Sequence, residues 1–68
     1  METTITILEQ TEEVRRDGRT NMLDFAGVQR AANDMNLYDL VVYMEDLKQG
    51  QWAGYLMGPF SMYVQGQS

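Results

Sequence analysis

The sequence predicts an all-α fold: a compact bundle of three helices, a short fourth element and a C-terminal tail. Apolar residues recur at intervals of three and four along the chain, which is the pattern of one buried stripe on a helix. Residue types that favour helix ends flank these stripes. With 68 residues and no cysteine, the chain has no disulfide to stabilise a small core, so it must pack its helices tightly or associate with itself.

The clearest helix is predicted over residues 37–49. Its stripe consists of Leu37, Leu40, Val41, Met44 and Leu47. Asn36 favours an N-cap position, and Asp39 stands three residues later, where a capping box places its carboxylate. Gly50 is the expected stop. Residues 40–43 are rich in β formers, so a strand is the alternative there.

A first helix is predicted over residues 5–17. Thr4 or Thr6 can cap its start, and Gly18 is suited to the left-handed residue that follows a helix. The β-branched start of this segment leaves a short strand as the alternative for its first residues.

A second helix is predicted over residues 25–35, with Asp24 as its N-cap. Leu23 and Val28 occupy the two positions of a hydrophobic staple. Gly27 costs this helix up to about 1 kcal/mol relative to alanine. Either it permits the close approach of another backbone, or it is a tolerated weak position.

The short fourth element is predicted over residues 51–57, where Trp52 and Tyr55 can fill the open side of a three-helix core. Pro59 ends this element, so residues 1–58 form the expected domain. Residues 59–68 form the expected tail: a short strand, a cover over the core, or an arm that reaches a partner.

The balance of charge bounds the function. Ten acidic residues against five basic ones give a net charge of −5, which disfavours direct binding to nucleic acid or to anionic membranes. The acidity either serves solubility or presents carboxylates to a basic surface that normally holds nucleic acid. No apolar run approaches the roughly 20 residues of a membrane helix, and the start lacks the pattern of a signal peptide. We therefore expect a cytoplasmic protein.

The residue types argue against catalysis. Without histidine or cysteine, neither the usual zinc ligand sets nor a nucleophilic triad can form. We expect no enzyme activity, metal or cofactor. Glu9, Glu12 and Glu13 are expected to form a solvated face of the first helix. The alternative is that they bind a cation or act as an acid/base pair, since Glu9 and Glu13 share a face.

The only basic cluster consists of Arg15, Arg16 and Arg19. It is the candidate contact for an anion, since guanidinium groups bind phosphate and carboxylate. The alternative is ordinary charge at a helix C-terminus.

A second apolar face on the third helix makes an interface the best functional inference. The candidate interface residues are Tyr38, Val42, Tyr43, Trp52 and Tyr55. The alternative is that the C-terminal part of the chain covers this face.

Three segments also resemble a family of small proteins of unknown function that bacteriophages and mobile elements encode. The segments are residues 16–24, 28–32 and 37–45, and the most specific part is Thr20-Asn21-Met22-Leu23-Asp24. In the family pattern, phenylalanine stands where Leu23 stands here. The resemblance implies a phage or prophage origin but brings no active-site residue.

We therefore expect a non-catalytic protein-interaction module that binds a host or phage protein and can form a homodimer. The first alternative is an acidic nucleic-acid mimic that inhibits a DNA-handling or defence enzyme of the host. The second is a small virion or assembly component.

Overall fold

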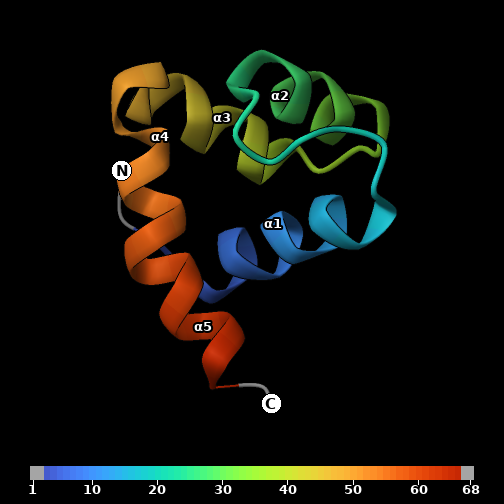
Figure 1. Ribbon diagram of the computed structural model, residues 1–68. Coiled ribbons are helices and arrows are strands. Elements are labelled where there is room, and N and C mark those ends of the chain that lie inside the picture. Colours follow the sequence, from blue (N-terminus) through green and yellow to red (C-terminus); the bar gives the residue numbers. More distant parts are fainter. Residues whose placement is uncertain (1–2, 67–68) are drawn as a thin grey trace.

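The chain folds entirely into helices in the computed structural model, which describes residues 3–66 and contains no strand within them (Figure 1). The elements are α1 (Ile5–Asp17), α2 (Phe25–Asp34), α3 (Tyr38–Leu47), α4 (Gln49–Tyr55), η1 (Leu56–Phe60) and α5 (Ser61–Gln65). The all-α prediction is confirmed, and the strand alternatives at the start of α1 and within α3 are wrong.

Both ends of α1 follow from the local sequence. The Thr4 hydroxyl accepts a hydrogen bond from the Ile7 N–H at 3.4 Å. At the other end, Gly18 has φ +74°, and its N–H donates to the Val14 carbonyl. A left-handed residue at this position costs glycine nothing, because it has no Cβ. The predicted bounds of this helix are confirmed.

The start of α2 is also local, because the Asp24 carboxylate accepts from the Gly27 N–H at 3.1 Å. The predicted staple is wrong: Leu23 is 67% exposed and does not cover Val28. The space at Gly27 is filled by side chains, not by another backbone. A Cβ there would lie 2.4 Å from the Thr20 hydroxyl oxygen.

At the junction between α2 and α3, the predicted role of Asn36 is wrong. This residue has φ +62° and ends α2, whereas an N-cap of α3 was predicted. The Leu37 N–H donates to the Ala32 carbonyl at 2.8 Å, and the Asn36 N–H donates to the Asn33 carbonyl at 3.1 Å. This pair of bonds is the Schellman arrangement, which accepts asparagine in the left-handed position.

The α3 helix has no side-chain cap from its own neighbourhood. The Gln10 side chain of α1 supplies one instead, because its carbonyl oxygen accepts from the Leu40 N–H at 2.8 Å. This bond satisfies a donor that the helix itself leaves free.

The end of α3 is a second correction, because Lys48 and not Gly50 takes the unusual backbone conformation. Lys48 has φ +73° and ψ +157°, a region that is almost restricted to glycine. Gly50 lies inside α4.

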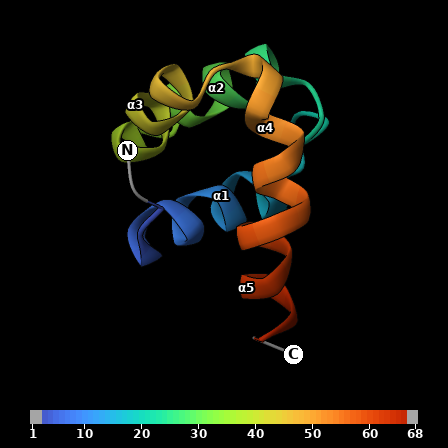
Figure 2. The ribbon, with the colours of Figure 1, turned by 90° about the vertical axis from the view of Figure 1, so that its left-hand side faces the viewer.

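The last three elements form one continuous helix that passes α1 and extends beyond it (Figures 1 and 2). Residues 59–65, which were expected to form a tail, continue this helix, so the strand alternative for them is wrong. Phe60 is buried in the core. Pro59 lies in η1, a π-helix. Proline lacks an N–H and crowds the preceding turn, which accounts for the departure from α geometry. Residues 67–68 of the expected tail lie outside the described residues.

Candidate functional site

The five candidate interface residues separate into two groups. Tyr43, Trp52 and Tyr55 are at most 4% exposed, whereas Tyr38 and Val42 are 55% and 51% exposed. The first three are core residues and offer no surface to a partner. The alternative, in which the C-terminal helix covers α3, thus accounts for these three but not for the other two.

The buried aromatic side chains attach the C-terminal helix to the rest of the fold. The Trp52 ring lies 6.0 Å from the Phe25 ring in an edge-on contact, and the Tyr43 and Tyr55 rings lie 5.2 Å apart. The Trp52 N–H donates to the Met22 carbonyl at 2.7 Å. A buried tryptophan N–H or tyrosine hydroxyl needs a hydrogen-bond partner in the interior. For Trp52 that partner lies in the loop before α2.

Tyr55 finds its partner in α1. The Thr11 hydroxyl donates to the Ile7 carbonyl at 2.8 Å, so the Tyr55 hydroxyl donates to Thr11, also at 2.8 Å. Burial raises the pKa of Tyr55 to about 12, against a smaller lowering by the hydrogen bond with Thr11. The group is neutral at physiological pH and has a structural role here.

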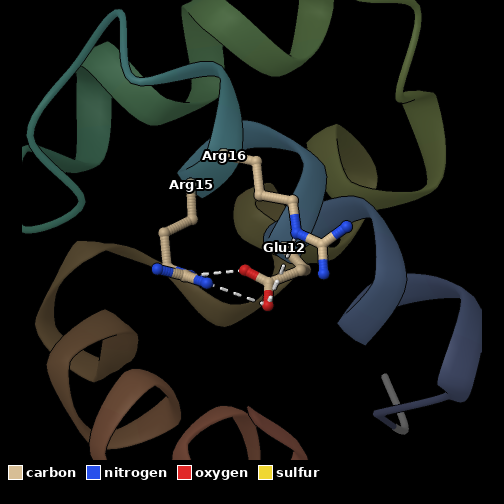
Figure 3. A network of polar contacts seen from close by, with 3 residues as sticks. All are labelled: Glu12, Arg15 and Arg16. Carbon is tan, nitrogen blue, oxygen red and sulfur yellow. Dashed lines mark hydrogen bonds and ion pairs between the residues drawn. The ribbon is translucent and has the colours of Figure 1, made fainter. Parts of the chain in front are cut away.

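At two of the three arginines of the candidate anion contact, Arg15 and Arg16, the Glu12 carboxylate of the same chain lies beside the guanidinium (Figure 3). Arg15 donates two hydrogen bonds to Glu12, one of them 3.1 Å long, and Arg16 lies 4.0 Å from the same carboxylate. Glu12 is 6% exposed and so is not part of a solvated face. The hydrogen bond from Arg15 lowers the pKa of Glu12, although burial opposes this effect.

Arg19 is similarly committed. It donates two hydrogen bonds to Asp17, and its guanidinium lies 3.9 Å from the Asp34 carboxylate. The hydrogen bond from Arg19 lowers the pKa of Asp17. An incoming anion would have to compete with these carboxylates. The alternative prediction, ordinary charge at a helix C-terminus, therefore describes the cluster better.

One feature escaped the sequence analysis: a groove of about 500 Å³ between α2 and α3. Its lining residues are Ala26, Gln29, Arg30, Asn33, Val41 and Glu45. On α2, Gln29, Arg30 and Asn33 follow Ala26 by three, four and seven residues, which places all four on one side of the helix. This spacing is visible in the sequence, but it does not distinguish a groove from an ordinary solvent-exposed helix face.

Tyr38 and Val42 stand on the same side of α3 as the groove residues Val41 and Glu45, because Val41, Val42 and Glu45 follow Tyr38 by three, four and seven residues. The Tyr38 hydroxyl donates to the Asn36 side chain at 2.7 Å. The most specific sequence motif, in contrast, builds the loop before α2. Asn21 accepts from the Leu23 N–H at 2.8 Å.

Residues 3–66 lack two further features. No group of three or more acidic, histidine or cysteine side chains there is arranged to hold a metal ion. None of the helices in this range is both long and apolar enough to cross a bilayer.

Together, the fold and this surface define a small helical domain with an exposed α2–α3 face. The chain belongs to the family described as Domain of unknown function (DUF5049), which it matches over residues 1–58. The resemblance to a family of unknown function is thereby confirmed. No curated protein and no solved structure matches the chain.

Proposed function

We propose that the protein is a non-catalytic interaction module, encoded by a phage or mobile element, that binds a protein through the α2–α3 face. This face comprises Tyr38, Val42 and the groove between the two helices. The observation that carries the proposal is the exposure of Tyr38 and Val42, which are neighbours at i and i+4 on α3.

An exposed tyrosine beside a β-branched residue suits a protein partner, because aromatic side chains contribute strongly to interfaces. The hydrogen bond from Tyr38 to Asn36 restrains the ring before binding. A side chain that is already ordered loses less conformational entropy when a partner covers it.

The groove adds polar groups for orientation. Arg30 stands on its α2 side and Glu45 on its α3 side, and Arg30 has no ion pair within the described part of the chain. A protein partner can thus make apolar contacts with Tyr38 and Val42 and pair with a charge of each sign beside them. Such charge complementarity contributes more to specificity than to affinity.

The test is affinity capture with the full chain from a lysate of the host, followed by titration of the purified partner. Tyr38→Ala and Val42→Asp should each weaken the binding by about tenfold or more. Leu23→Asp is the matched control, because Leu23 is exposed and lies outside this face. Equal affinities for all four proteins would refute the α2–α3 face as the binding site.

The acidic nucleic-acid mimic is the second candidate. Glu9 and Glu13 favour it, because both are exposed on α1 and neither carboxylate has an ion pair within residues 3–66. Binding through such charges falls steeply as salt rises, whereas binding through Tyr38 and Val42 tolerates salt. Loss of affinity in Glu9→Gln/Glu13→Gln, with full affinity in Tyr38→Ala, would favour the mimic.

A further inference from the structure

The C-terminal helix has an apolar face that no other part of the described chain covers. Its largest side chains are Met57 and Met62, which are 76% and 74% exposed. Ala53 and two glycines, Gly50 and Gly54, are exposed beside them. We call these five residues the outward face.

The geometry of the helix brings the outward face together. At about 100° per residue, Gly50, Gly54 and Met57 fall opposite the buried Trp52 and Tyr55. In an α-helix, Met57 and Met62 would point about 140° apart. The π-helix η1 lies between them and takes roughly one residue more per turn. Residues five apart therefore lie close to the same side.

The glycines on this helix have no explanation inside the fold. Gly50, Gly54 and Gly58 recur every fourth residue, and a Cβ added to any of them would meet no atom within 4 Å. None of them has a positive φ. Each weakens the helix relative to alanine, yet no neighbour within residues 3–66 requires the side chain to be missing. Small residues at this spacing allow another helix to approach closely.

The distribution of charge along the chain favours a second copy as the partner of the outward face. Every charged residue of the chain lies at or before Lys48, and those residues carry the whole net charge of −5. Two copies that met through the charged part would bring like charges together. The C-terminal helix carries no charge from Gln49 onward, so the outward face is where a second copy meets the least repulsion.

The end of this helix is also open to approach. No residue of α5 is buried, and the helix extends beyond α1 in both views of the ribbon (Figures 1 and 2). The family match ends at residue 58, so α5 and Met62 lie beyond the part that the family shares.

We propose that the outward face binds the outward face of a second copy and so forms a symmetric homodimer. In a twofold dimer the same patch serves both copies, and two helices cross with their glycines and methionines in contact. Methionine suits such a contact because its unbranched side chain fills irregular gaps. The α2–α3 face remains free in each copy, so this proposal does not depend on the proposed function.

The test is the molar mass of the full chain by sedimentation equilibrium over a wide concentration range. We expect a concentration-dependent rise from the chain mass of 7.8 kDa to twice that value. The double variant Met57→Glu/Met62→Glu should raise the dissociation constant about a hundredfold or more. Leu23→Glu is the control, because it adds a charge at another exposed apolar residue and should leave the dissociation constant nearly unchanged.

Gly54→Ala gives a second, independent measurement. Alanine should raise the thermal midpoint of the dilute monomer, because it favours the helix and meets no neighbour. It should also weaken the dimer, because the added methyl group keeps the two helices apart. A dimer that Gly54→Ala strengthens would contradict the close approach.

Three results would overturn the proposal. They are a wild-type monomer at every concentration, a dimer that the double methionine variant leaves intact, and equal weakening of the dimer by the Leu23 control. Co-sedimentation of a monomeric wild type with phosphatidylcholine vesicles, lost in the double variant, would assign the face to a membrane surface instead.

Discussion

The first 48 residues and the last 20 are attached to the same core by different means. The first part holds all ten acidic and all five basic residues, and side chains accept hydrogen bonds at the starts of its three helices: Thr4 for α1, Asp24 for α2 and Gln10 for α3. Residues 49–65 of the second part form one uncharged helix, held by Trp52, Tyr55 and Phe60 on a single side. The first part thus combines buried apolar side chains with many polar contacts, whereas the second is held mainly by a few large apolar side chains.

This difference separates the side chains that stabilise the fold from those available for binding. In the charged part, Arg15 and Arg19 are bound to carboxylates of the chain itself, so charge at these positions is largely internal. In the uncharged part, Trp52, Tyr55 and Phe60 are buried, whereas Met57 and Met62 are exposed. The α2–α3 face and the outward face consequently keep apolar side chains available to partners.

The largest effect should come from Trp52→Ala, which removes the main attachment of the uncharged helix. The change leaves a cavity and an unpaired Met22 carbonyl, and large-to-small substitutions of this kind cost about 3–5 kcal/mol. A small domain has little stability to lose. Urea unfolding followed by circular dichroism should show a greatly lowered midpoint, or no folded baseline. Tyr38→Ala, on the exposed face, should change the midpoint little. Equal midpoints for the two variants would contradict the separation of core and surface aromatics.

The next effect concerns alkaline pH and again belongs to the uncharged helix. Tyr55 has a folded-state pKa of about 12 against 10.0 for the free group. The stability that the neutral Tyr55 hydroxyl contributes is therefore complete below pH 10 and is lost as pH rises through about 12. The total loss in unfolding free energy is about 2–3 kcal/mol. Unfolding free energies measured across this range should fall more steeply for the wild type than for Tyr55→Phe. Thr11 keeps the Ile7 carbonyl as its acceptor in that variant. Parallel curves would show that Tyr55 does not resist ionisation.

A smaller effect is expected at the boundary between the two regions. Lys48→Gly relieves a backbone conformation that costs a lysine roughly 1–3 kcal/mol, but glycine adds entropy to the unfolded chain. We expect a net gain of about 1 kcal/mol in unfolding free energy, measured by urea titration. Gln49→Gly, one residue further and inside α4, is the control and should lower stability. A destabilised Lys48→Gly would mean that the lysine conformation carries no strain.

The smallest effect should appear at acid pH and belongs to the charged part. The pKa of Glu12 is lowered from 4.5, so its contribution is present above pH 4.5 and is lost as pH falls through the lower folded-state value. In Glu12→Gln the stability should depend less on pH in this range. The difference is small because Arg15 and Arg16 are largely exposed to solvent. A steeper dependence in the variant would reverse the sign we assign.

The sequence predicted the elements whose end signals are local. Thr4, Gly18 and Asp24 act within a few residues of their own positions, so α1 and the start of α2 followed from the sequence alone. Asn36 was assigned to the wrong helix because the same side chain favours both a helix start and a left-handed helix end. Only the backbone angle distinguishes the two.

Other features depend on contacts between distant parts of the chain. The pattern of α3 gave two apolar sides but could not tell which one the C-terminal helix covers. Tyr43 therefore stood beside Tyr38 among the candidate interface residues. The continuation of the helix through Pro59 was missed because proline normally ends a helix, and a π-helix leaves no signal of its own in the sequence.

The bond from Gln10 to Leu40 has a consequence for how the protein reaches this structure. The first turn of α3 obtains its missing acceptor from a residue thirty positions earlier, so that helix is not self-sufficient. A synthetic peptide of residues 36–48 should be mostly unstructured in water, since short isolated helices nucleate poorly. Assembly must then couple distant segments early, and the molecule should fold as one cooperative unit despite consisting only of helices.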